Sequence, residues 1–297
     1  MPRARRVRRM ARSAPRSTTA AAPPLPPAPK TVAAPVAAPP GVPPILDGYT
    51  TEAPSAQLAI DVFAGEWSST FPAGYGDSGG KVPLFEDQRI TWLVERIGGV
   101  EGASVLELGP LEGGHTTMLE RAGATVTAVE SNSRAYLKCL VSKEVMGLRR
   151  STFLRGDFIA YLERERPSYD LVVASGVLYH MLDPFRLLEL MASAADTLML
   201  WTHYFDAEVL AVEPFARMFT RDPEPVVRGG RTYLLHRRDY LEALGWGGFC
   251  GGGAPYANWI ERDDILGFLG ALGYECETAF DQPDHPNGPA FALLARR

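Results

Sequence analysis

The stretch VLELGPLEGGH, from Val105 to His115, decides the fold that we expect for this chain. An apolar, strand-like string runs without a polar linker into a turn that contains three glycines and one proline. Glycines let the backbone of such a turn approach a ligand closely, and the N–H groups at the start of a following helix are free to bind it. The stretch therefore predicts a strand, a ligand-binding turn and a helix.

Short apolar strings alternate with amphipathic ones from about residue 85 to the end of the chain. Apolar residues at helical spacing in LFEDQRITWLVERIG predict a helix ahead of the first strand. The alternation that follows predicts an α/β fold, in which a parallel sheet is covered by helices on both faces. The strings that we interpret as its strands are SVLEL, TVTAVE, TFLRG, YDLVVAS and DTLMLWT.

Local signals refine this arrangement. Asp183 and Pro184 are expected at the N-cap and the first position of the helix after the fourth strand. YECETA and PAFALLARR, joined by a turn-rich linker, are expected to close the sheet as an antiparallel pair. Residues 205–258 are too many for a simple link, and we interpret them as an insert that forms a lid or a substrate subsite.

The glycine spacing distinguishes between cofactors. A dinucleotide site requires G-x-G-x-x-G, whereas Gly109 is followed here by Pro110 and Leu111. Glu107 and Glu112 place carboxylates around the turn, which would repel a pyrophosphate and suit a ligand with an ammonium and a sulfonium group. This pattern points to S-adenosylmethionine.

The next strands also end in acidic residues. Glu130 ends the second strand, where a carboxylate can accept hydrogen bonds from both ribose hydroxyls. Asp157 and Phe158 follow the third strand, where the acid can reach an adenine amino group and the ring can stack on the base. The alternative is that Glu130 and Asp157 are only the caps of the helices that follow them.

Residues from about 85 to 297 resemble a class I S-adenosylmethionine-dependent methyltransferase, through E-x-G-x-x-x-G at Glu107–Gly113 and the acids Glu130 and Asp157. The resemblance implies a Rossmann-like, doubly wound and mostly parallel seven-stranded sheet, with S-adenosylmethionine as the cofactor. It also implies a cofactor site that includes Gly109 and Gly113.

A shorter resemblance concerns SGVLYHMLDPFRLL, which is similar to the segment after strand four in the transferase that completes carboxymethoxyuridine at the tRNA wobble position. It implies that Tyr179 lines the methyl-transfer pocket. Ser175, which stands where that transferase has Met, is expected at the cofactor site. It also keeps a tRNA- or RNA-modifying methyl or carboxymethyl transferase as an alternative.

Three histidines follow predicted strands. His180 and His203 are the candidate bases for a protonated acceptor, with Tyr179 and Tyr204 as positioning groups. An ordinary imidazole pKa of about 6.5 would make the rate rise through that pH. The alternative is that each histidine caps a helix or bonds a backbone carbonyl. His115, beside the cofactor turn, is interpreted as structural, and no metal site is expected.

Residues 1–46 differ in composition from the remainder. They hold seven Arg, one Lys, no acid and twelve of the 25 prolines, and we expect a disordered basic arm. Because the whole chain carries −5 and the arm +8, the remainder carries −13, which favours a small-molecule acceptor over a polyanion. RNA binding or organelle targeting by the arm, and an inert tail, are alternatives.

The remaining expectations concern organisation and class. Residues 47–84 are interpreted as a cover segment, in which Trp67, Phe71 and Tyr75 could wall the pocket, and residues 85–297 as the methyltransferase domain. No stretch is apolar enough to span a membrane, and three scattered cysteines favour a cytoplasmic protein. A small- or modest-sized acceptor methylated on oxygen or nitrogen is the expected substrate. A NAD-dependent oxidoreductase and a non-catalytic cofactor-binding module are the alternatives.

Overall fold

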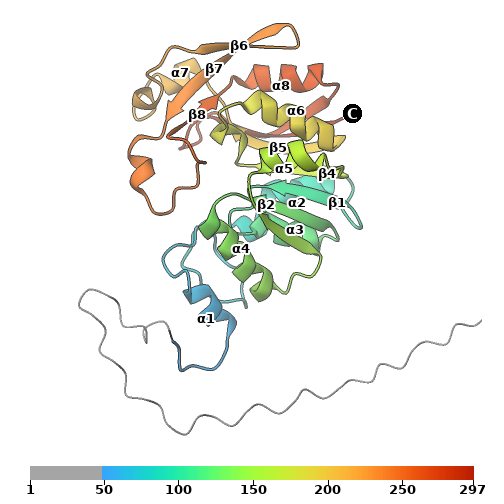
Figure 1. Ribbon diagram of the computed structural model, residues 1–297, viewed down its shortest axis with the longest axis vertical. Coiled ribbons are helices and arrows are strands. Elements are labelled where there is room, and N and C mark those ends of the chain that lie inside the picture. Colours follow the sequence, from blue (N-terminus) through green and yellow to red (C-terminus); the bar gives the residue numbers. More distant parts are fainter. Residues whose placement is uncertain (1–48) are drawn as a thin grey trace, which may run out of the picture. The chain divides into compact units, whose positions relative to one another are not determined.

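The computed structural model describes residues 49–297, of which Pro54–Arg297 form one compact unit. Its centre is a seven-stranded sheet with the order β3-β2-β1-β4-β5-β10-β9 (Figure 1). The first five strands are parallel, and β10 runs antiparallel to both β5 and β9. The predicted Rossmann-like sheet and its antiparallel closing pair are confirmed.

The strands are β1 (Ser104–Leu108), β2 (Thr125–Glu130), β3 (Ser151–Arg155), β4 (Leu171–Ser175), β5 (Thr197–His203), β9 (Glu275–Gln282) and β10 (Ala290–Arg296). The predicted basic arm, residues 1–46, lies outside the described residues.

Helices cover both faces of the sheet and enclose two hydrophobic cores. In β1, Leu106 and Leu108 face one core while Val105 faces the other, as expected for a strand buried on both sides. The first core packs against α5 (Phe158–Glu165), α6 (Pro184–Ala194) and α8 (Arg262–Ala271). The second packs against α2 (Gln88–Arg96), α3 (Gly114–Arg121) and α4 (Ser133–Met146).

The helix starts follow their capping residues. Asp183 caps α6 by accepting a hydrogen bond from Arg186 N at 3.0 Å, and Pro184 is the first helical residue, as predicted. Asn132 caps α4, so Glu130 is not the cap of that helix. Asp157 does cap α5, through Ala160 N at 2.9 Å.

The segment between β5 and α8 forms a second, three-stranded antiparallel sheet that the sequence patterns did not predict. It consists of β6 (Glu224–Arg228), β7 (Arg231–Asp239) and β8 (Tyr256–Trp259), and it is drawn in orange and red in Figure 1. Tyr233 and Leu235 of β7 are buried against the first core while Leu234 is exposed, which explains the alternation in RTYLLHRRD. A short helix, α7 (Ala207–Leu210), precedes this sheet.

Residues 54–86 pack against the second core as a cover segment. It contains α1 (Ala56–Asp61) and the 3₁₀ turn η2 (Leu84–Glu86), and Ser69 pairs with Val82 in an isolated bridge. Its aromatic side chains, including Trp67 and Phe71, are buried in that core.

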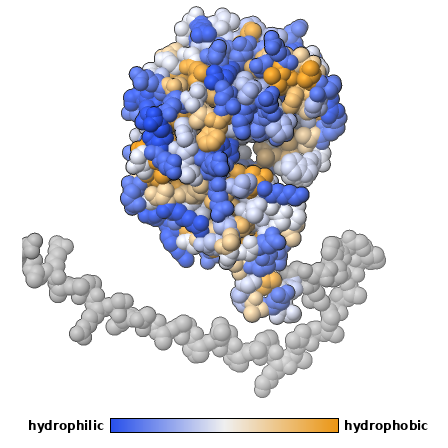
Figure 2. Space-filling model, turned by 180° about the vertical axis from the view of Figure 1, so that it is seen from behind, coloured by the Kyte–Doolittle hydropathy of each residue, from blue (hydrophilic) through white to orange (hydrophobic). Residues whose placement is uncertain are grey.

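The surface carries no single large apolar face in the view of Figure 2, where hydrophilic and hydrophobic residues are interspersed. Trp246, Val227 and Val212 are the most exposed of the large apolar side chains apart from Tyr49 and Val62, and each is 60% exposed or more. Among the described residues, no helix has both the length and the apolar composition that a membrane crossing requires.

Candidate active site

A cavity of about 1080 Å³ opens at the carboxyl ends of β1, β2, β4 and β5. This edge of a parallel sheet, next to the change in strand order between β1 and β4, is where ligands bind in open α/β folds. The volume is at the upper end of that of small-molecule sites and leaves room for both a cofactor and an acceptor. The lining comes from the β1–α3 turn, the segments that follow β2, β3 and β4, Trp201 of β5, and residues 249–254 of the insert, together with Arg89 and a few residues that precede it.

Three residues of the glycine turn have positive φ, namely Gly109, Leu111 and Gly113. Gly109 has φ 65°, and a Cβ atom there would lie 2.6 Å from Cγ1 of Val177, so the turn passes directly against the segment after β4. Gly113 has φ 80° and is the N-cap of α3. Gly109 lines the cavity but Gly113 does not, so Gly113 shapes the start of the helix rather than the cavity wall.

Glu130 lies on the cavity wall with spare hydrogen-bonding capacity. One carboxylate oxygen accepts from Leu111 N at 3.1 Å and the other from Asn132 N at 2.8 Å. Burial raises the pKa of Glu130 despite these two bonds. The Glu130 carboxylate can accept about four hydrogen bonds, and two of these positions are used. The remaining positions can accept hydrogen bonds from two hydroxyl groups of a ligand.

Asp157, Phe158 and Ser175 also line the cavity. Asp157 is exposed, so capping α5 with one oxygen leaves the other for a ligand. Phe158 is 7% exposed and packs in the first core. The hydroxyl oxygen of Ser175 is buried with no hydrogen-bond partner among the described residues.

The acids of the turn itself lie beneath the cavity and do not line it. Glu107 is 2% exposed, accepts a hydrogen bond from the Thr116 hydroxyl, and lies 3.9 Å from Nδ1 of His115. Burial raises the pKa of Glu107. Its carboxylate therefore contacts two side chains in the first turn of α3.

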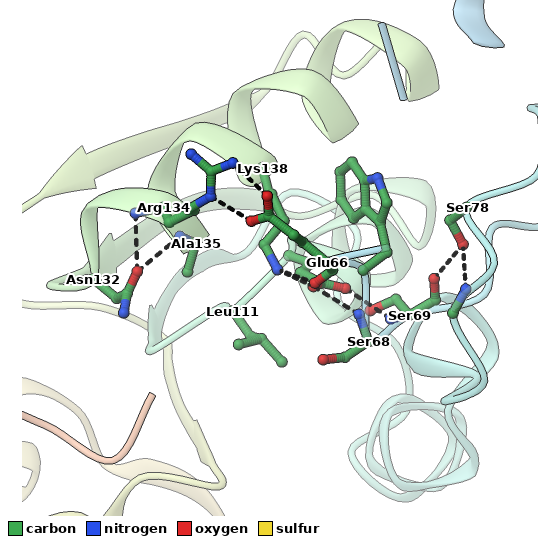
Figure 3. Close-up of polar contacts among 12 residues, drawn as sticks. Glu66, Ser68, Ser69, Ser78, Leu111, Asn132, Arg134, Ala135 and Lys138 are labelled. Atoms are coloured by element: carbon green, nitrogen blue, oxygen red, sulfur yellow. Dashed lines mark hydrogen bonds and ion pairs between the residues drawn. The ribbon is translucent and has the colours of Figure 1, made fainter. Parts of the chain in front are cut away.

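Glu112 does not line the cavity, so the interpretation that two carboxylates flank the ligand is wrong. It is fully buried, accepts from the backbone N–H groups of Ser68 and Ser69, and pairs with Lys138. Figure 3 shows Lys138 and both serines converging on this site, with Glu66 close by. The carboxylate therefore binds the cover segment to the cofactor turn.

A cluster of charged residues next to the turn was missed from the sequence. Asp87, the cap of α2, accepts hydrogen bonds from the Arg89 guanidinium and lies 2.9 Å from Nε2 of His115. Burial raises the pKa of Asp87, but the bonds from His115 and Arg89 outweigh it and hold that pKa well below its ordinary value. Arg89 lines the cavity and lies 4.4 Å above the ring of Trp201. The only feature of the sequence that could have indicated this cluster was the position of Asp87, an acid directly before a predicted helix.

Tyr179 and His180 lie in the 3₁₀ turn η3 (Leu178–His180) and both line the cavity. Nδ1 of His180 lies 2.7 Å from the hydroxyl of Tyr240. Burial, the positive charge of Arg238 and the nearby His203 lower the pKa of His180 to about 3, so this ring is neutral at pH 7. The expected rise in rate near pH 6.5 therefore does not follow for this side chain.

His203 does not line the cavity, contrary to its predicted place beside the reacting groups. Its Nδ1 bonds the carbonyl oxygen of Gly288 at 2.8 Å, which was the alternative interpretation for this histidine. Its ring stacks on Trp259 at 5.2 Å, and burial lowers its pKa to about 4. The ring of Tyr179 packs against the rings of both histidines. Its centroid lies 4.1 Å from that of His180 and 4.6 Å from that of His203.

The roof of the cavity differs in detail from the expected one. Trp67 and Phe71 are buried in the second core, and Tyr75 stacks with Arg121, so none of the three lines the cavity. The cover segment contributes Ser68, Val82 and Leu84 instead. The insert contributes Phe249, Cys250 and the small residues that follow, while Trp246 is exposed and Trp259 is buried in the fold.

Comparison with known proteins agrees with this geometry. Residues 106–197 match the family model described as a methyltransferase domain. The match runs from β1 to the start of β5 and identifies this part of the chain as a methyltransferase domain, on the sheet and the glycine turn described above. No curated protein sequence matches the chain.

Among solved structures, the N-terminal domain of EvdMO1, crystallised in the presence of S-adenosylhomocysteine (SAH) and D-fucose, is similar. The likeness has a TM-score of 0.57 at 20% identity and covers 78% of this chain and 91% of that domain. A second structure of the same domain, with SAH bound, gives the same TM-score and identity. Full-length EvdMO1 is matched over 44% of its length, with a TM-score of 0.51. At this identity the likeness concerns the fold.

Proposed function

We propose that this protein transfers a methyl group from S-adenosylmethionine to an oxygen or nitrogen atom of a small or modest-sized acceptor, with His180 as the base. The observation that carries the proposal is that one cavity is lined both by five of the predicted cofactor residues and by His180. When bound, S-adenosylmethionine supplies an electrophilic methyl group on a sulfonium centre, whose positive charge disappears as the methyl group leaves.

The cofactor half of the cavity is the part next to the ends of β1, β2 and β3. Here Glu130 would accept hydrogen bonds from ribose hydroxyls, and Asp157 would accept one from an adenine amino group. The unpartnered hydroxyl of Ser175, at the end of β4, supports a ligand where the cofactor half meets the acceptor half. Gly109 would allow close approach of the ligand, and Glu107 and Gly113 would hold the turn from below.

The acceptor half lies at the ends of β4 and β5, between Tyr179, Trp201 and the insert. Burial raises the pKa of Tyr179, so its phenol stays neutral and can position an acceptor but not take up its proton at pH 7. The neutral imidazole of His180 has a lone pair for that proton. Uptake of the proton places one positive charge on His180 as the sulfonium charge disappears, so the net charge of the cavity stays constant.

The cover segment and the insert would then exclude water from the reacting groups. We assign the cover role to residues 54–84, the part of the predicted cover segment that belongs to the compact unit, and the roof role to residues 205–258. His203, which lies behind Tyr179, would hold that ring in place and not touch the acceptor.

Calorimetric titration tests the cofactor assignment, because SAH should bind and NAD should not. A screen with methyl-labelled S-adenosylmethionine then tests the acceptor. It should include sugars, since EvdMO1 was crystallised with D-fucose, and tRNA, which stands for the RNA-modifying alternative. Absence of SAH binding to the folded protein would reject the proposal, and labelling of tRNA alone would replace the small acceptor by RNA.

A further inference from the structure

Two consecutive hydrogen bonds link His180 to the insert. Nδ1 of His180 lies 2.7 Å from the hydroxyl oxygen of Tyr240, and that hydroxyl lies 2.8 Å from the carbonyl oxygen of Gly251. A carbonyl oxygen can only accept, and a phenol has one hydrogen to give. Tyr240 therefore donates to Gly251, and the bond to His180 forms only if Nδ1 carries the hydrogen.

This arrangement selects one tautomer of the imidazole. With the hydrogen on Nδ1 and the ring neutral, Nε2 has a free lone pair. Nε2 makes no hydrogen bond to any described residue, and His180 is a cavity-lining residue. The opposite tautomer would place the lone pair on Nδ1 against the oxygen of Tyr240, which has no hydrogen left to donate.

The partners of His180 are fixed by packing far from it in the sequence. Tyr240, directly after β7, is 3% exposed, and its ring packs against Phe249 with centroids 4.9 Å apart. The guanidinium of Arg238 lies 5.3 Å from the centre of the same ring. The loop also contacts the cofactor side, because Asn132 Nδ2 lies 3.4 Å from the carbonyl oxygen of Phe249.

We propose that Tyr240, with its hydroxyl oriented by the Gly251 carbonyl, is the positioning residue of His180 and keeps Nε2 unprotonated toward the acceptor. The proposal rests on the function proposed above, in which His180 is the base. In the reaction, the bond between sulfur and the methyl carbon breaks, the bond between that carbon and the acceptor atom forms, and the acceptor's proton passes to Nε2. The protein is neither oxidised nor reduced in this step. The hydrogen bond from Nδ1–H to the Tyr240 hydroxyl persists throughout, so neither side chain has to reorient.

The test measures the tautomer directly by NMR of protein labelled with ¹³C and ¹⁵N in its histidines, at pH 7 with SAH present. The His180 signals are assigned by their absence in His180→Gln. In the wild type, the Nδ1–H form should predominate over the Nε2–H form, because one hydrogen bond changes the ratio of the two by about tenfold. Tyr240→Phe should reduce this ratio by about tenfold.

Two glycine variants of the same loop provide a second test and its control. A Cβ atom at Gly251 would lie 2.7 Å from the ring of Phe249 and 2.8 Å from that of Tyr240, so Gly251→Ala should displace Tyr240 and shift the ratio in the same direction. A Cβ atom at Gly253 meets nothing within 4 Å, so Gly253→Ala should leave it unchanged.

The proposal is overturned if the wild type carries the hydrogen on Nε2, or if Tyr240→Phe and Gly251→Ala retain the wild-type ratio while folded. The tautomer measurement does not depend on turnover. If His180→Gln keeps full methyl transfer, the role of His180 as base fails, whatever the tautomer result. Once an acceptor is known, Tyr240→Phe should lower kcat without changing the affinity for SAH.

Discussion

Glu112 of the cofactor turn and Lys138 of α4 form a buried ion pair, with 2.5 Å between Oε1 and Nζ. Glu112 is fully buried and the Lys138 side chain is 9% exposed. Lys138 also donates to the carbonyl oxygen of Glu66, and the second oxygen of Glu112 accepts from Ser69 N (Figure 3). The pair thus joins three elements that lie far apart in the sequence.

Replacing Lys138 by Met should destabilise the protein strongly. The change leaves the Glu112 carboxylate buried without a counter-charge, and losing one partner of such a pair costs about 3–5 kcal/mol. The free energy of unfolding in urea measures the effect. Lys81→Met removes the same charge from an exposed residue of the cover segment and should change stability little; equal effects of both variants would contradict a buried pair.

Glu130→Gln should weaken SAH binding by about tenfold, because a hydrogen bond to a charged acceptor is lost. Titration calorimetry at pH 7 gives the dissociation constants. Glu144→Gln makes the same substitution on the exposed face of α4 and should leave the affinity unchanged. Unaltered binding by folded Glu130→Gln would remove this residue from the ribose site.

His180→Gln should lower turnover by roughly 10²–10⁴ while the affinity for SAH stays the same, because Gln cannot take up the acceptor's proton at neutral pH. Burial lowers the pKa of His180 to about 3, so the wild-type rate should show no step from this group between pH 5 and 8. A rate step near pH 6.5 that disappears in the variant would show that the imidazole titrates at its ordinary value. Equal losses of rate and of SAH affinity would instead place His180 in the cofactor half.

His203 should make the protein less stable in acid. Its folded pKa of about 4 lies below the unfolded value of about 6.5, so the unfolded chain takes up the proton first as the pH falls, and stability decreases with it. Between pH 7.5 and 5 this contribution amounts to about 2 kcal/mol. His203→Gln should therefore lose about 2 kcal/mol less than the wild type over that range, measured by urea unfolding at both pH values. If the wild type and His203→Gln lose the same amount of stability, His203 has the same pKa in the folded and the unfolded state.

Local patterns were sufficient to predict most of the large sheet. Thr125–Glu130 was predicted residue by residue, and the Asp183–Pro184 helix start is also observed. A strand buried on both faces produces a continuous apolar string, and a cap uses only neighbouring residues. The three-stranded sheet was not predicted, since β6 and β8 are short and obtain their pairing from β7.

The cavity was predicted less completely. The positions of Gly109 and Glu130 at strand ends follow from the topology, because the carboxyl ends of parallel strands meet at one edge. Glu112 and His203 occupy equally plausible positions in the sequence, yet one is paired with Lys138 and the other bonds Gly288. Spacing along the chain does not determine which partner a side chain meets.

The sequence by itself therefore determined the sheet and the glycine turn, because both depend on periodicity and on backbone conformations that single residues permit. Only the tertiary structure decided which acids and histidines reach the cavity. It brings Tyr240 and Gly251 to His180 from 60 and 71 residues away, respectively, in the numbering of the chain. A hydrogen-bond partner at such a separation is selected by the packing of the insert against the sheet, and no local pattern records that packing.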